Sequence, residues 1–244
     1  MIDSRETPWG MWATIGWGLV VGAALILFQV LVFEGLGAIE RTMNLDIGVE
    51  AMAKNLKLNG FVLALAIFVT TPFGIGLIAL LAWLRRGPSV KRYLGFNAIA
   101  PRTMLTWLGI LTLFALIADA LAHLLGRPLI PDFMVDAYAT AYFPPLFWFA
   151  IIVAAPLFEE VFFRGFLFEG FQHSKLGPLG AVMLTSLAWT ILHVQYGAYE
   201  LSIIFAIGIV FGLARFQTRS IYPPLAMHAL FNLFAMVQLV AYFQ

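Results

Sequence analysis

Hydrophobic residues fill seven stretches of the chain, each close to the length of a membrane-spanning helix. The stretches lie at residues 11–33, 60–84, 104–125, 146–171, 179–194, 199–216 and 222–242. Glycine, proline or charged residues separate them and favour helix ends there. A helix needs about 20 apolar residues to cross a bilayer. The pattern therefore predicts an all-α fold, a polytopic transmembrane bundle of about seven membrane-spanning helices.

Polar and apolar residues alternate irregularly between the first two of these stretches. Residues 35–59 mix charged side chains with Met, Leu, Ile and Val. Such a mixture is typical of an amphipathic helix lying at the membrane interface. We therefore expect a short interfacial helix in this segment.

The composition of the chain supports a membrane protein. Of its 244 residues, 62% are hydrophobic and 11% are charged, whereas charged residues make up about 25% of a soluble domain. The net charge of +1 argues against a nucleic-acid partner. The chain has no cysteine, which excludes disulfides, thiolate nucleophiles and cysteine-bound metals. Carboxylates, imidazoles and amides remain as the groups available for chemistry.

Lysine and arginine residues near the helix ends predict the orientation of the chain. With a cytoplasmic N-terminus, ten basic residues face the cytoplasm and four face the other side, as the positive-inside rule favours. The cytoplasmic group comprises Arg5, Arg85, Arg86, Lys91, Arg92, Arg102, Arg164, Lys175, Arg215 and Arg219, and the opposite group Arg41, Lys54, Lys57 and Arg127.

Three charged residues interrupt the fourth apolar stretch: Glu159, Glu160 and Arg164. A charged side chain at the centre of a bilayer costs roughly 2.5–3.5 kcal/mol, so these residues are expected to face protein or water. Glu160 and Arg164 are four residues apart on one helix face and can form an ion pair. Glu159 points about 100° away and lacks that partner. A purely structural salt bridge is the alternative interpretation, but it leaves Glu159 unexplained.

Two further helices carry polar pairs with the same four-residue spacing. Trp189 and His193 lie at the end of the fifth stretch, and His228 and Asn232 lie in the seventh. Each pair alone is explained by hydrogen bonding between helices. Together with Glu159, they supply a carboxylate, two imidazoles and an amide, which are groups suited to activating water and stabilising an oxyanion.

This order of motifs, Glu-Glu-x-x-x-Arg, then aromatic-x-x-x-His, then His-x-x-x-Asn, resembles the CPBP family of intramembrane metalloproteases. That family includes CAAX prenyl protease 2 and its bacterial relatives. The resemblance covers residues 145–240, which we interpret as a CAAX-protease-like catalytic core. Residues 1–144 then form N-terminal transmembrane helices with interfacial and basic loops. Trp189 is a small departure, since this position more commonly holds phenylalanine.

The resemblance implies a role for each motif residue. Glu159 and His193 would orient and deprotonate a water molecule, and His228 and Asn232 would stabilise the oxyanion. Glu160 and Arg164 would support the site. Zinc is one implied cofactor, because Glu159, His193 and His228 could form a ligand set with an open position for water. A metal-independent glutamate mechanism is the alternative.

These observations lead to one main hypothesis and two alternatives. The main hypothesis is an intramembrane endopeptidase, in the plasma membrane of a prokaryote, that hydrolyses peptide bonds of membrane-associated substrates, including CAAX-type prenylated ones. The first alternative is a non-proteolytic membrane adaptor or bacteriocin self-immunity protein. The second is ion or solute transport through a relay of Glu159 and Glu160, although the sequence has no evident internal repeat of the kind common in transporters.

Overall fold

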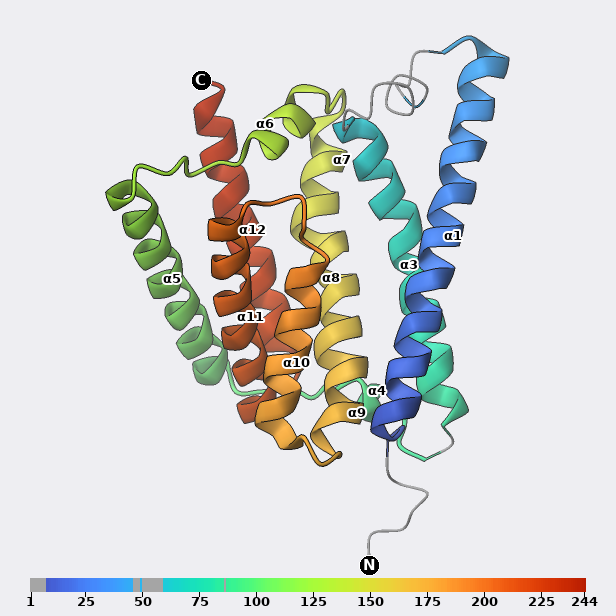
Figure 1. The fold of residues 1–244 in the computed structure, drawn as a ribbon, viewed down its shortest axis with the longest axis vertical. Coiled ribbons are helices and arrows are strands. Elements are labelled where there is room, and N and C mark those ends of the chain that lie inside the picture. The colour runs from blue at the N-terminus through green and yellow to red at the C-terminus, as the bar shows by residue number, and fades with distance from the viewer. Residues whose placement is uncertain (1–7, 46–48, 50–58, 86) are drawn as a thin grey trace, which may run out of the picture.

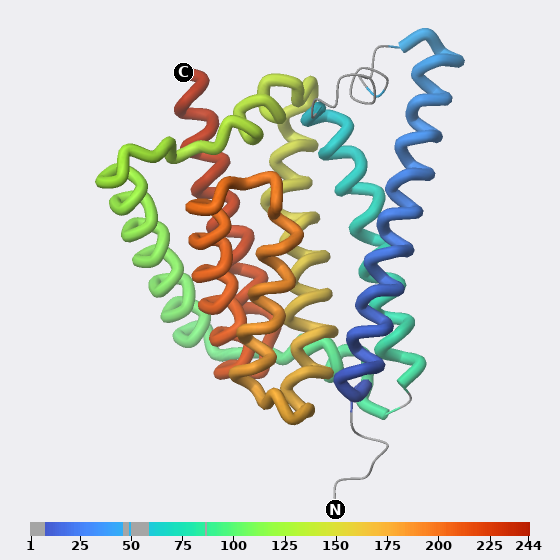
Figure 2. Tube along the Cα trace, viewed as in Figure 1, coloured from blue at the N-terminus to red at the C-terminus, as the bar shows by residue number. Residues whose placement is uncertain are grey.

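The computed structural model describes residues 8–45, 49, 59–85 and 87–244. Within these residues the chain forms a bundle of helices without strands, with the long helices packed side by side (Figures 1 and 2). The predicted all-α transmembrane bundle is confirmed.

The helices differ widely in length. One continuous helix, here called the central helix, covers residues 144–172 and includes two π-helical segments, η2 and η3. In chain order the elements are α1 (Met11–Met43), α3 (Gly60–Leu84), α4 (Val90–Tyr93), α5 (Pro101–Leu124), α6 (Asp132–Ala139), α7 (Pro144–Phe149), η2 (Ala150–Ala154), α8 (Ala155–Glu160), η3 (Val161–Leu167), α9 (Phe168–Gln172), α10 (Gly177–Ile191), α11 (Ala198–Thr218) and α12 (Tyr222–Tyr242).

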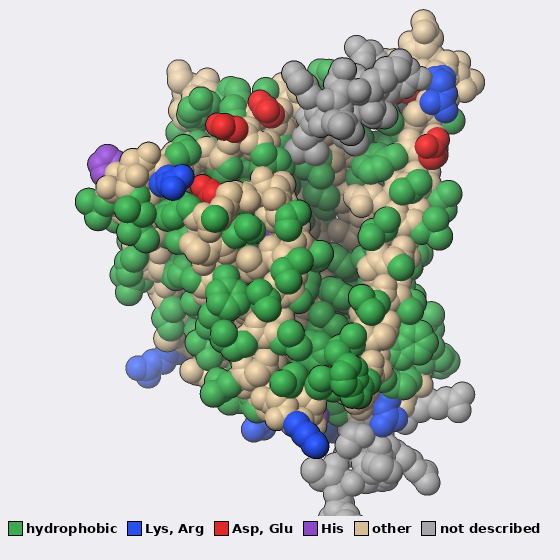
Figure 3. All heavy atoms as spheres, in the orientation of Figure 1, with side chains coloured by type: hydrophobic (Ala, Val, Ile, Leu, Met, Phe, Trp, Pro, Cys, Tyr) green, Lys and Arg blue, Asp and Glu red, His purple; other side chains and the backbone are tan. Residues whose placement is uncertain are grey.

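Six helices of the described part are long and apolar enough to cross a membrane: α1, α3, α5, the central helix, α11 and α12. The protein is therefore an integral multi-pass membrane protein. On the face drawn in Figure 3, apolar side chains cover the middle of the bundle, whereas charged side chains gather towards its two ends. This distribution matches a bilayer with polar interfaces on both sides.

The fifth predicted span is shorter than expected. Helix α10 has 15 residues and ends at Ile191 rather than at residue 194. At 1.5 Å per residue it extends about 22 Å, less than the roughly 30 Å of a hydrocarbon core. Hydrogen bonds from His193 N to Thr190 O and from Tyr196 N to His193 O turn the chain there. Residues 192–197, called the α10–α11 connection below, lead directly into α11.

The first helix is longer than predicted. Helix α1 continues past residue 33 to Met43, so the first part of the expected interfacial helix belongs to α1. The segment contains no proline to end the helix earlier. Asn44 ends it with a left-handed φ of 50°, and its N–H bonds to Glu40 O. Residues 46–48 and 50–58, the remainder of that prediction, lie outside the described residues.

The central helix lies within the bundle and contributes most to its core. All seven residues of η3 are buried, and they pack with buried residues of α3, α10, α11 and the α4–α5 region. Close contact with α1 requires a small residue at Gly170, because a Cβ there would collide with the buried side chain of Thr14. The charged motif therefore sits on the most enclosed helix of the bundle.

Candidate active site

Two π-helical segments flank the short helix α8, which ends with the two glutamates. In η2 the N–H of Ala155 bonds to Ala150 O, and at the end of η3 the N–H of Phe168 bonds to Phe163 O. These bonds span five residues instead of four. A π segment adds a residue to the turn and shifts the helix face that follows, which is why such segments often occur at functional sites. The orientation of Glu159 and Glu160 thus depends on both segments.

Glu160, Arg164 and His228 form a buried cluster. Arg164 Nη1 donates to Glu160 Oε1 at 3.1 Å, and both side chains are 0% exposed. His228 Nδ1 lies 2.9 Å from the same carboxylate oxygen. The ion pair between Glu160 and Arg164 expected from their spacing is confirmed, and His228 joins it from α12.

Helix α11 completes the surroundings of the arginine. Arg164 Nη2 donates to Gly208 O at 3.1 Å. Gly208 permits this approach, because a Cβ there would lie 3.2 Å from Trp189 and 3.4 Å from the guanidinium. The guanidinium also lies over the ring of Trp189, 4.9 Å from its centroid. A cation over an aromatic face in a desolvated place is stabilised by about 2 kcal/mol.

Glu159 is separate from this cluster and more accessible. Its side chain is 22% exposed, and its Oε2 accepts a hydrogen bond from Trp189 Nε1 at 2.5 Å. The same oxygen lies 3.9 Å from His228 Nε2. The sequence separated the two glutamates correctly but missed the indole donor. The signal was present as tryptophan in place of phenylalanine, since only tryptophan carries an N–H.

His193 is oriented by the backbone of α10. Its Nδ1 lies 2.8 Å from Trp189 O. A carbonyl oxygen can only accept, so Nδ1 donates, and the neutral ring keeps a free lone pair on Nε2. The ring also packs against Trp189 and Tyr196, with centroids 5.0 and 6.0 Å apart. His193 can therefore act as a base or as a ligand through Nε2.

Glu159 and His193 both contact Trp189 but do not contact each other through a hydrogen bond. The indole donates to Glu159, and its ring contacts His193, but no hydrogen bond or ion pair joins these two residues. Glu159 also faces the α10–α11 connection. Burial raises the pKa of the Tyr196 hydroxyl, and the negative charge of Glu159 raises that pKa further. The Glu159 carboxylate thus lies between Trp189 and His228.

Asn232 contacts the central helix one segment away from the glutamates. Its Nδ2 donates to Ile151 O at 2.7 Å. In the five-residue register of η2, the backbone N–H of residue 156 would bond to Ile151 O. Residue 156 is proline and has no N–H, so the amide of Asn232 supplies a donor. One of its two N–H groups holds η2, and the other remains available.

The three residues predicted as zinc ligands do not gather around one point. Glu159 Oε2 and His228 Nε2 face each other across 3.9 Å. His193 does not join them: the described residues contain no group of three histidine, aspartate or glutamate side chains placed to hold a metal ion. Zinc thus stays a prediction of the resemblance.

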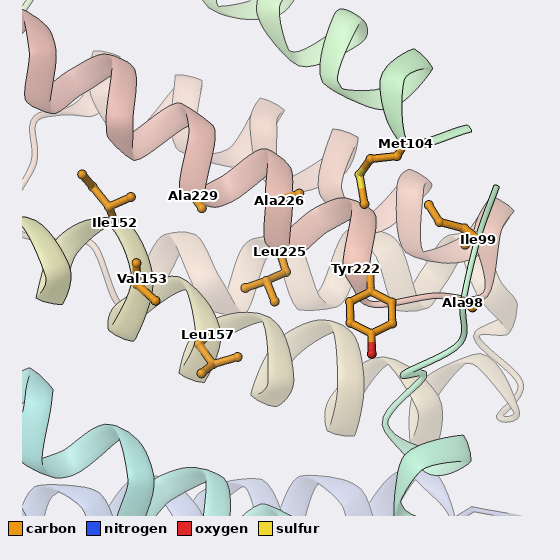
Figure 4. A pocket seen from close by; sticks show the side chains of 10 residues that line it. All are labelled: Ala98, Ile99, Met104, Ile152, Val153, Leu157, Tyr222, Leu225, Ala226 and Ala229. Atoms are coloured by element: carbon orange, nitrogen blue, oxygen red, sulfur yellow. The ribbon is translucent and has the colours of Figure 1, made fainter. Parts of the chain in front are cut away.

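An apolar groove lies between the central helix and α12 (Figure 4). It has a volume of about 530 Å³ and opens between α8, α12 and the start of α5. Leu157, one turn before Glu160, and Ala229, next to His228, form part of its wall. Because apolar side chains dominate its lining, the groove suits a hydrocarbon chain better than a charged group.

The fold and this arrangement define a class of protein: a helical membrane protein with a buried ion pair on its central helix and, next to it, a partly exposed carboxylate and two imidazoles. Residues 140–234 match the family described as type II CAAX prenyl endopeptidase Rce1-like. The chain therefore carries an Rce1-like domain, and the resemblance to the CPBP family is confirmed. The match includes all six predicted site residues and supports a CAAX-type intramembrane endopeptidase in general. No curated protein and no solved structure matches the chain.

Replacing Trp189 with phenylalanine tests the indole bond to Glu159. The Trp189→Phe variant keeps a ring against His193 and Arg164 but removes the donor to Glu159. A hydrogen bond to a charged group is worth about 1.5–3 kcal/mol, and 1.4 kcal/mol is about tenfold in rate. We expect kcat for a peptide reporter to fall about tenfold with KM little changed.

Trp148 provides the matched control, because its buried Nε1 has no hydrogen-bond partner. Trp148→Phe removes the same atoms and should leave kcat unchanged. Equal kcat values for Trp189→Phe and the unsubstituted protein would show that the indole bond does not orient Glu159.

Proposed function

We propose that this protein is an intramembrane endopeptidase that hydrolyses peptide bonds of membrane-associated substrates, CAAX-type prenylated ones among them. The observation that carries the proposal is the placement of Glu159. Its carboxylate is held by the indole of Trp189, is partly exposed, and lies 3.9 Å from His228, while the ring of His193 packs against the same Trp189. A general base needs this combination of access and fixed geometry.

Water is the nucleophile in this proposal. It binds between Glu159 and Nε2 of His193, which has a free lone pair. Glu159 takes one proton from the water as its oxygen adds to the scissile carbonyl carbon, and the carbonyl electron pair moves to oxygen. Collapse of the tetrahedral intermediate breaks the C–N bond, and the proton passes to the departing amine. His193 orients the water by accepting a hydrogen bond from its second O–H at Nε2.

The oxyanion is stabilised by His228 and Asn232. Nδ1 of His228 donates to Glu160, and Nε2 lies 3.9 Å from Glu159. In the proposed mechanism the protonated imidazole donates from Nε2–H to the oxyanion that forms beside Glu159. The second N–H of Asn232 adds a neutral donor. Fixed donors of this kind in a water-poor site stabilise developing negative charge strongly.

The apolar groove supports a lipid-linked or membrane-embedded substrate. Its wall includes Leu157 and Ala229, which adjoin the residues of the buried cluster. A hydrocarbon chain bound there would hold a substrate beside the central helix and within the membrane. Binding energy from a remote part of the substrate can then position the scissile bond.

Glutamate and histidine substitutions test the reaction. We expect Glu159→Gln and His193→Ala to lower kcat about 10²–10⁴-fold, the usual contribution of general acid–base catalysis. The measurement is hydrolysis of a fluorogenic farnesylated CAAX peptide by purified protein, with an unprenylated membrane-embedded reporter in parallel. Cleavage of the second reporter alone would support the peptidase activity but contradict prenylated proteins as substrates.

Exposed residues of the same types serve as controls. Glu34→Gln and His123→Ala change the same chemical groups on the exposed surface and should leave hydrolysis unchanged. If Glu159→Gln and His193→Ala retain full rates, the assignment fails. Loss of a cellular phenotype without loss of hydrolysis would instead favour an adaptor or immunity function.

Metal dependence follows from the separation of the three predicted ligands. Because Glu159, His193 and His228 do not converge, we propose that hydrolysis proceeds without zinc. We expect purified active protein to contain far less than one zinc ion per chain and to keep its activity after treatment with a chelator. Stoichiometric zinc that disappears in His193→Ala and His228→Ala would contradict this proposal.

We also propose a cytoplasmic N-terminus in the plasma membrane of a prokaryote. Six basic residues of the larger predicted group lie in the short helix α4, at the start of α5 or in connections, all at the end of the bundle where α1 begins: Arg85, Lys91, Arg92, Arg102, Lys175 and Arg219. Arg41 and Arg127 lie towards the opposite end. Arg5, Arg86, Lys54 and Lys57 fall outside the described residues.

Single cysteines introduced into this cysteine-free chain test the orientation. In intact cells, a membrane-impermeant maleimide should label Asp132→Cys and leave Lys175→Cys unlabelled, and both should react after lysis. Labelling of Lys175→Cys alone in intact cells would reverse the topology.

A further inference from the structure

Arg215 is a buried arginine of α11 with no part in the reaction described above. It is 2% exposed. Its Nε donates to Arg164 O at 2.8 Å, and its Nη2 donates to Glu169 Oε2 at 2.9 Å. A single guanidinium thus binds both the backbone of η3 and a side chain of α9.

The carbonyl that Arg215 contacts is the one that the π segment leaves without a donor. The N–H of Phe168 bonds to Phe163 O, five residues back. From α9 onward the chain is again α-helical. In that register each N–H bonds to the carbonyl four residues earlier, so the N–H of Glu169 pairs with Gly165 O. The carbonyl of Arg164 is therefore passed over. A buried carbonyl without a donor is destabilising, and the Nε–H of Arg215 supplies the missing donor.

The position of Arg215 is fixed from several sides. Its guanidinium lies over the ring of Phe168, 5.2 Å from the centroid. Gly95, with a left-handed φ of 77°, lies so close that a Cβ there would be 2.8 Å from the guanidinium. Gln172 Nε2 donates to the same oxygen of Glu169. Arg215 therefore has little freedom to move away from η3.

Arg164 thus has two contacts: its carbonyl accepts from Arg215, and its side chain pairs with Glu160. Movement of the backbone at Arg164 would shift that pair and the adjacent Glu159. At the other end of α8, Asn232 holds the open carbonyl of η2 in a similar way. Each π segment is thus fastened by a side chain from a different helix.

We propose that Arg215 is a positioning residue for the reaction: by donating to the Arg164 carbonyl while paired with Glu169, it holds η3 in the five-residue register that aims Glu159 at the site. The proposal rests on the proposed function for its kinetic consequence. Its structural consequence, a π segment stabilised from α11, is independent of any activity.

The test uses Arg215→Lys in the full-length protein. A lysine keeps the positive charge for Glu169 but has no N–H corresponding to Nε, so it cannot hold both acceptors with the arginine geometry. We expect kcat per folded molecule to fall at least tenfold with KM within twofold, with the folded fraction measured by thermal unfolding. Amide exchange in residues 161–168, followed by mass spectrometry, should become faster.

Three further variants separate the contributions. Arg102→Lys makes the same change at an exposed arginine and should alter neither kcat nor exchange. Glu169→Gln retains an acceptor and the bond to Arg164 O, so it should lower kcat less than Arg215→Lys does. Gly95→Ala leaves Arg215 in the chain but places a methyl group against its guanidinium, and it should reproduce the loss in kcat.

The outcomes distinguish the two proposals. Unchanged amide exchange in Arg215→Lys overturns the positioning role, as does an unchanged kcat per folded molecule. If the unsubstituted protein cleaves no reporter, the proposed function fails. Faster exchange confined to Arg215→Lys and Gly95→Ala would then still support the attachment of η3 by Arg215.

Discussion

The buried ion pair of Glu160 and Arg164 constrains everything around it. Both side chains are fully enclosed, and removing one partner of such a pair typically costs about 3–5 kcal/mol, since a charge is left without compensation. His228 donates to the Glu160 oxygen that Arg164 also binds, and the carbonyl of Gly208 accepts from Arg164 Nη2, which draws α12 and α11 against the central helix. Glu160 Oε2 and Arg164 Nε are buried without a hydrogen-bond partner among the described residues. The need to satisfy two buried charges thus brings three helices together at the depth of the site.

Trp189 links this enclosed cluster to the accessible part of the site. One face contacts the guanidinium of Arg164, while the indole N–H holds Glu159 and the ring packs against His193 and His228. The tryptophan therefore separates a glutamate that is neutralised inside the bundle from one that is partly exposed. Two adjacent glutamates thus have different surroundings, because the Trp189 side chain bonds to one and lies against the ion pair of the other.

The sequence predicted the parts of this structure that depend on hydropathy and on spacing along one helix. The helical bundle and the pairing of Glu160 with Arg164 follow from those signals. The short length of α10 could not be predicted from those signals. Apolar residues continue to Val194, whereas the helix ends at Ile191 and the chain turns at His193. Contacts such as Trp189 with Glu159 join residues 30 apart on different helices. The π segments likewise depend on packing against other helices, for which a single sequence has no local signature.

The π segment η3 also limits how the chain can change in length. It contains one residue more than an α-helical path of the same span would need. Loss of Val161, Phe162 or Phe163 would let the helix close into regular α geometry and would shorten the separation of Glu160 and Arg164 from four residues to three. Glu159 rather than Glu160 would then stand four residues before the arginine, the spacing that forms the buried ion pair in the intact chain. A one-codon deletion there would therefore break the constellation while leaving every motif residue in the gene.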